Sequence, residues 1–146
     1  MKLWQNLYGM IWLVFLQIIL IVVLPSSSIY VIALHAVIGL AIFGLAFADN
    51  SMMQKLEVPF RLKGIVKSTL SLAAAQLVLG ILLYVVNNFY NLSGGLASTV
   101  VTFIHVAISL AIITQASSAA TAYDMWEEKE YNPPYTDPRL KSTKST

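Results

Sequence analysis

Four long stretches without a charged side chain constrain this chain more than any other feature. They cover residues 7–24, 29–48, 68–86 and 98–120, and none contains Asp, Glu, Lys or Arg. A helix of about 20 apolar residues, rising about 1.5 Å per residue, crosses the roughly 30 Å hydrocarbon layer of a bilayer. Backbone groups in lipid must pair within their own segment, which favours helices. We therefore expect an all-α membrane protein with four transmembrane helices in an up-down bundle.

The composition agrees with this fold class and excludes several others. Hydrophobic residues make up 58% of the 146 residues and charged residues only 11%, whereas soluble domains carry about a quarter charged residues. This argues against a soluble enzyme and against a nucleic-acid-binding protein. The chain has no cysteine, so disulfides, thiolate zinc sites and iron–sulfur clusters are excluded. We expect one transmembrane domain over residues 1–123 and a charged, proline-containing cytoplasmic tail over residues 124–146.

The distribution of basic residues predicts how the domain is oriented. The connections at residues 25–28 and 87–97 carry no charge, whereas the loop between the second and third spans is basic. Cytoplasmic loops are enriched in Lys and Arg. We therefore expect a multi-pass protein of the cell membrane with both termini in the cytoplasm, on the side of four basic residues: Lys55, Arg61, Lys63 and Lys67.

The two halves of the chain resemble each other. Residues 34–42 align with residues 104–112, with five identical positions of nine, and this alignment pairs His35 with His105. In the preceding spans, Gln17 aligns with Gln76. Apolar helices often resemble one another by chance, so the matched Gln and His residues are the stronger evidence for a repeat. The sequence thus predicts two copies of a helix hairpin, each with Gln on its first helix and His on its second.

The paired histidines are the only two in the chain, and both lie inside apolar spans. Ionisable residues in such positions are rare and usually functional. His35 and His105 follow the starts of their parallel spans by six and seven residues, which places both roughly 10 Å below the outer surface. The second and fourth helices of an up-down bundle are diagonal. Two imidazoles reaching across that diagonal would leave room for one iron, with bonds of roughly 2 Å.

These positions favour a haem held by two axial histidines, a common arrangement between facing helices. Gly39 and Ser109 lie one turn after the histidines, where a small residue leaves room for a flat macrocycle or permits close helix packing. The candidate cofactor site therefore comprises His35 and His105 as iron ligands, with Gly39, Ser109, Gln17 and Gln76 around them. The alternative is that Gln17, Gln76 or backbone groups simply satisfy two buried histidines.

The motifs in the second half have a counterpart in a known family. The segments at residues 75–80, Ala-Gln-Leu-Val-Leu-Gly, and 105–111, His-Val-Ala-Ile-Ser-Leu-Ala, are similar to motifs of the heme A synthase family. Over residues 7–120 the chain resembles one four-helix half of that family, which implies a haem-binding bundle with histidines on its second and fourth helices. The family carries an acidic residue and usually an arginine where this chain has Ile32 and Ala36, so the resemblance implies the scaffold rather than the oxidation.

Three functions remain open from the sequence. The first is a b-type cytochrome subunit of a respiratory complex, with one haem B per chain near the outer face and possible exchange with a quinol. The second is a cofactor-free accessory subunit of a respiratory or oxidase complex. The third is a minimal heme A synthase-like enzyme. We favour electron transfer or an accessory role over independent catalysis, with the bilayer and other membrane subunits or a second copy as partners.

Overall fold

The computed structural model describes residues 3–24, 28–89 and 95–131, and these residues form four α-helices. The helices are α1 (Leu3–Val23), α2 (Ile29–Gln54), α3 (Phe60–Phe89) and α4 (Leu96–Tyr131). All four are long and apolar enough to cross a membrane. The expected all-α four-helix fold is confirmed, and the chain is a multi-pass membrane protein.

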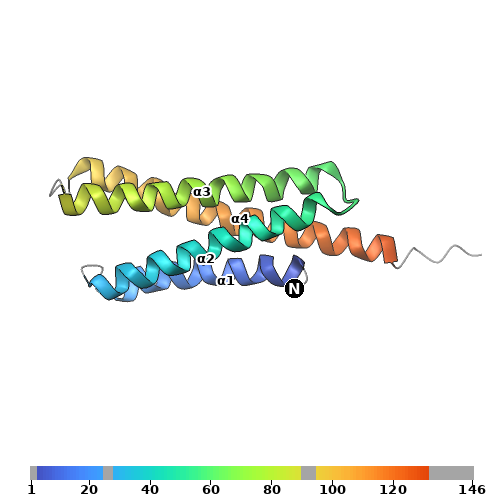
Figure 1. Cartoon of the computed structure of the whole chain (residues 1–146), viewed down its shortest axis with the longest axis horizontal. Coiled ribbons are helices and arrows are strands. Elements are labelled where there is room, and N and C mark those ends of the chain that lie inside the picture. Colours follow the sequence, from blue (N-terminus) through green and yellow to red (C-terminus); the bar gives the residue numbers. More distant parts are fainter. Residues whose placement is uncertain (1–2, 25–27, 90–94, 132–146) are drawn as a thin grey trace, which may run out of the picture.

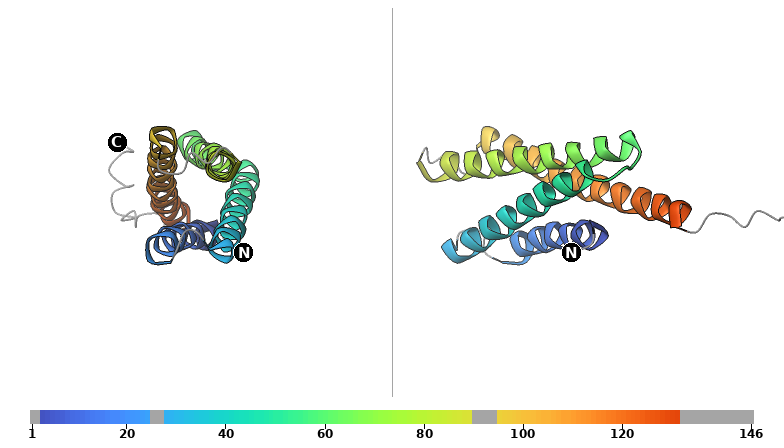
Figure 2. Two further views of the ribbon diagram at one scale, coloured as in Figure 1. Left: turned by 90° about the vertical axis from the view of Figure 1, so that its left-hand side faces the viewer. Right: turned by 45° about the vertical axis from the view of Figure 1, so that its right-hand side comes forward.

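The helices run up and down around a square, as the end-on view in Figure 2 shows. Each helix contacts its two neighbours: α1 packs on α2 and α4, and α3 packs on the same two helices. Within the described ranges, no backbone contact joins either diagonal pair. The histidine-bearing helices α2 and α4 are therefore diagonal, as the up-down order predicts.

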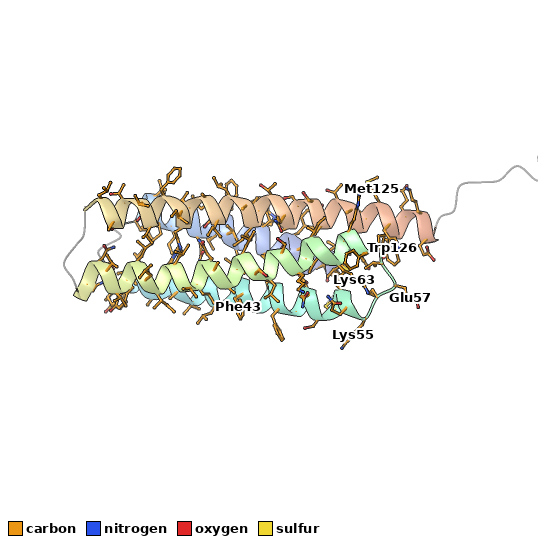
Figure 3. All side chains as sticks on the ribbon, turned by 90° about the horizontal axis from the view of Figure 1, so that it is seen from above. Phe43, Lys55, Glu57, Lys63, Met125 and Trp126 are labelled. Carbon is orange, nitrogen blue, oxygen red and sulfur yellow. The ribbon has the colours of Figure 1, made fainter. Side chains whose placement is uncertain are left out.

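The two ends of the bundle differ in chemistry. At one end lie the start of α1, the connection between α2 and α3, and the end of α4; we call this the terminal half (Figure 1). Lys55, Glu57 and Lys63 lie at this end, as does Trp126 of α4 (Figure 3). The opposite end carries the other two connections, and we call it the histidine half. From the connection at Lys55–Pro59 toward the histidine half, α2 and α3 diverge (Figure 1).

In the terminal half the helices extend beyond the predicted apolar spans. Because α3 begins at Phe60, the residues Arg61, Lys63 and Lys67 lie on its first turns rather than in a loop. The apolar count finds only the part of a helix that lies in lipid, whereas intrahelical hydrogen bonding continues where water solvates the side chains. Likewise α4 continues to Tyr131, and the rest of the predicted tail, residues 132–146, lies outside the described residues.

The surface of the bundle is apolar on every side, as expected for helices in lipid. Trp12, Val22 and Phe103 each expose more than 70% of their surface. The interior combines apolar residues with a few buried polar side chains, namely Asn6, Gln17, Asp49, Thr69, Ser98 and Ser109. Polar groups inside a membrane bundle are costly unless they are paired, so their partners are informative.

Candidate functional site between the histidines

His35 of α2 and His105 of α4 face each other across the diagonal of the bundle. Their ring centroids are 6.1 Å apart and their planes make an angle of 43°. His105 is nine residues from the start of α4, against six for His35 from the start of α2. The extra turn at the start of α4 does not separate the rings. The structure thus brings together the two histidines that the sequence pairs.

Each imidazole keeps one buried nitrogen atom without a hydrogen-bond partner among the described residues. The Nδ1 atoms of both rings are buried and have no hydrogen-bond partner. Among the described residues, Gln17 and Ser109 donate hydrogen bonds to the backbone carbonyl oxygens of the two histidines. These hydrogen bonds do not involve the imidazole rings. The alternative in which Gln17, Gln76 or backbone groups bind the rings is therefore not the observed arrangement.

Gln17 of α1 fixes the backbone of His35. Its Nε2 donates a hydrogen bond of 2.7 Å to the His35 carbonyl oxygen, and the Gln17 side chain is buried. Gly39 makes this approach possible, because a Cβ at that position would lie 3.3 Å from the Gln17 Nε2. The space beside Gly39 is therefore largely taken by Gln17. This matches the packing role that the sequence left open for Gly39.

Gln76 of α3 reaches His105 by a different route. Its Nε2 donates to the hydroxyl of Ser109, and the Ser109 hydroxyl donates to the His105 carbonyl oxygen at 3.1 Å. The Gln76 Oε1 is buried without a partner. Gln17 and Gln76 both brace the backbone of a histidine, and Ser109 is the link on one side only.

A cavity of about 480 Å³ surrounds the two rings. It contains all six residues of the predicted site, and its walls are otherwise mostly apolar. The lining residues of α1 and α4 are buried or half-buried, whereas the exposed lining residues all belong to α2 and α3. These exposed residues are Ile29, Ala33, Ala36, Leu40, Ile81 and Tyr84. The cavity therefore opens sideways between α2 and α3, where the two helices diverge.

Gly80 also shapes the cavity, although the predicted site did not include it. Gly80 lies one turn after Gln76 on α3, and a Cβ there would lie 3.5 Å from the His105 Cε1. The i, i+4 spacing from Gln76 puts both residues on one face of the helix, so this signal was present. In the sequence, Gly80 was interpreted only as the last residue of the family motif at residues 75–80, and not as a residue that lines the site.

The donor set of this site is two nitrogen atoms. Among the residues that the structure describes, no three His, Cys, Asp or Glu side chains come together to hold a metal ion. Two imidazoles suit a metal whose other ligands come from a macrocycle better than a bare zinc ion, which takes three or four protein ligands.

Comparison of the chain with models of protein families, with curated proteins and with solved structures found no match.

Proposed function

We propose that the protein is a b-type cytochrome of the membrane, binding one haem between His35 and His105. The observation that carries this proposal is the facing pair of unsatisfied imidazoles inside an apolar cavity. A buried polar group without a partner destabilises the fold, so a chain that keeps two at one level gains from a ligand that satisfies both.

The spacing of the rings fits iron between them. Two iron–nitrogen bonds of about 2 Å, plus roughly 1.1 Å from each coordinating nitrogen to its ring centre, give a separation of about 6 Å. The observed separation of the ring centroids is 6.1 Å. Aromatic rings in ordinary contact also lie about 4.5–7 Å apart, so the observed separation is compatible with one iron between the rings but does not require it.

The cavity suits a flat, mostly apolar group. Its volume of about 480 Å³ lies within the range of cofactor pockets, and small residues at Ala36, Ala73 and Gly80 leave room beside the rings. Its side opening faces the bilayer, where an apolar macrocycle partitions. Tyr84 at the exposed edge supplies a hydroxyl for a polar substituent.

The bound group would supply one-electron redox chemistry. If His35 and His105 both bound the iron of a haem, no coordination position would remain for a substrate. The cavity wall also has Ile32 and Ala36 where the heme A synthase family has an acid and an arginine, and no acidic side chain lines it. These features favour electron transfer over haem modification, although the scaffold resembles one half of that family.

The distribution of basic residues supports a position of the haem near the outer face of the membrane. Lys55, Arg61, Lys63 and Lys67 all belong to the terminal half, so the positive-inside rule places that half in the cytoplasm. The haem then lies near the outer face of the cell membrane. We propose that its redox partner is a quinol or another subunit of a respiratory complex, reached from the outer leaflet or the outer surface.

A pyridine haemochrome assay on the full chain purified in mild detergent tests this function. We expect one haem B per chain, and the spectrum of a six-coordinate, low-spin iron before pyridine is added. A double His35→Ala/His105→Ala variant should fold and carry no haem. A well-folded wild type that takes up no haem, even when haem is supplied during expression, would overturn the proposal and favour a cofactor-free accessory subunit.

A further inference from the structure

A buried carboxyl group lies far from the histidines. Asp49 of α2 follows His35 by fourteen residues, about 21 Å along the helix, and so belongs to the terminal half. In the sequence, Asp49 directly follows the second uncharged stretch, residues 29–48. The structure instead places it in the interior of the bundle, where only 1% of its surface is exposed.

Asp49 lies beside Asn6 and has no balancing cation among the described residues. The Asn6 side chain of α1 is 3% exposed and lies next to the Asp49 carboxyl group. Even so, both Asp49 oxygens and the Asn6 Oδ1 lack a hydrogen-bond partner within the described ranges. The described part of α1 has no charged residue. The charged residues described in α3, in α4 and in the connection before α3 do not pair with the Asp49 oxygens: Lys55, Glu57, Arg61, Lys63, Lys67, Asp124, Glu127, Glu128, Lys129 and Glu130.

One proton would remove the buried charge and pair two of these three oxygens. An ionised carboxylate buried without a cation is strongly unfavourable, and such groups become neutral instead. The protonated acid has an O–H donor, and the Asn6 Oδ1 is an acceptor that lacks one. A metal ion is a poorer fit, because calcium takes six to eight oxygen ligands and magnesium a full octahedron. Three unpartnered oxygens fall short of either.

A second cavity lies in the terminal half. It has a volume of about 370 Å³, and Met52, Lys55 and Glu127 are among its lining residues. Neither Asn6 nor Asp49 lines this cavity, but the Asn6 Nδ2 contacts the Met52 Sδ at 3.8 Å. Met52 therefore links Asn6 to a cavity lined by charged groups.

We propose that Asp49 and Asn6 form a proton-binding site within the membrane, which exchanges its proton with the aqueous phase at the terminal half. Asp49 holds the proton as a neutral carboxylic acid and Asn6 accepts its hydrogen bond. The site is independent of the proposed haem, because it uses other residues in the opposite half. Buried carboxyl groups of this kind serve proton transfer in membrane proteins.

Infrared spectroscopy of the full chain in lipid vesicles tests this site. At neutral pH we expect a C=O stretching band of a protonated carboxylic acid, which moves on exchange into heavy water. Asp49→Asn should abolish the band, whereas the matched control Asp124→Asn, on the exposed end of α4, should leave it unchanged. Asn6→Leu should keep the band but move it to higher frequency, because the acid loses its acceptor.

Three results would overturn the proposal: no acid band at neutral pH, a band that persists in Asp49→Asn, or a band that does not move on exchange into heavy water. Should Asn6→Leu fail to fold, Asn6→Ala also removes the acceptor, and an unchanged band position would exclude Asn6 as the partner. Helical content from circular dichroism confirms folding of each variant, and the assay needs no haem.

Discussion

The two hairpins perform the same task with different chemistry. In the first hairpin, Gln17 binds the His35 carbonyl directly. In the second, Gln76 binds Ser109, which binds the His105 carbonyl. Gly39 and Ser109 occupy equivalent positions in the repeat. The comparison teaches that the size of this residue decides the route: glycine admits the glutamine to the backbone, and serine replaces that contact with its hydroxyl.

The two hairpins share the support of a histidine but differ in how they border the opening of the cavity. Both place a histidine ring at the centre and brace its backbone from the neighbouring helix. Only α2 and α3 open toward lipid, since the cavity residues of α1 and α4 are not exposed. The repeat is therefore symmetric at the rings and asymmetric at the opening of the cavity.

The largest expected effect tests whether the two histidines are equivalent. His35→Ala and His105→Ala should each weaken haem binding at least about ten-fold, because each removes one iron ligand. Remaining haem should become high-spin, as seen in the optical spectrum. Thr114→Ala, on the exposed face of α4, is the control. A variant that keeps a six-coordinate spectrum would show that the histidines do not act as a pair.

The next effect concerns the tight approach in the first hairpin. Gly39→Ala places a methyl group 3.3 Å from the Gln17 Nε2, so Gln17 must move and its hydrogen bond weakens. We expect a loss of about 1–2 kcal/mol in the free energy of unfolding, measured by titration with a denaturing detergent. Gly44→Ala on the same helix is the matched control, because no atom lies within 4 Å of its added Cβ. Equal stability of the two variants would contradict the role of Gly39.

A smaller effect tests the serine link in the second hairpin. Ser109→Ala and Gln76→Leu should each destabilise the fold, and together by less than their sum, because they remove one shared chain of hydrogen bonds. We expect a coupling free energy of about 0.6 kcal/mol, typical of hydrogen bonds between membrane helices. The pair Ser109→Ala and Gln17→Leu serves as the reference and should be additive. If the effects were additive in both double-mutant cycles, Ser109 would not link Gln76 to the His105 carbonyl.

The smallest effect contrasts Gly80 with Gly39. A methyl group at Gly80 would lie 3.5 Å from the His105 Cε1, an ordinary contact. Gly80→Ala should therefore keep the free energy of unfolding or raise it by up to about 1 kcal/mol, since alanine favours helix more than glycine does. The same detergent titration measures it. A loss as large as that of Gly39→Ala would mean that the cavity tolerates no added atom beside His105.

Much of the fold could be predicted from the sequence, because it depends on lengths and order along the chain. Four uncharged runs predict four membrane-spanning helices, and successive spans cross the membrane in opposite directions. That arrangement makes the helices of His35 and His105 diagonal, and the similar positions of the histidines in their predicted spans bring the rings to a similar level. The uncharged runs do not mark where the helices end, because helices continue past the apolar residues into the region of Arg61 and Lys67.

The tertiary structure decided the rotation of each helix about its own axis. These helices are apolar on nearly every face, so no hydrophobic stripe in the sequence selects the side that turns inward. Packing therefore determined that the rings meet at 6.1 Å, that Gln17 and Gln76 bind different groups, and that Asp49 turns into the core. It also determined that the cavity opens between α2 and α3, because the divergence of two helices depends on the side chains between them and not on their order.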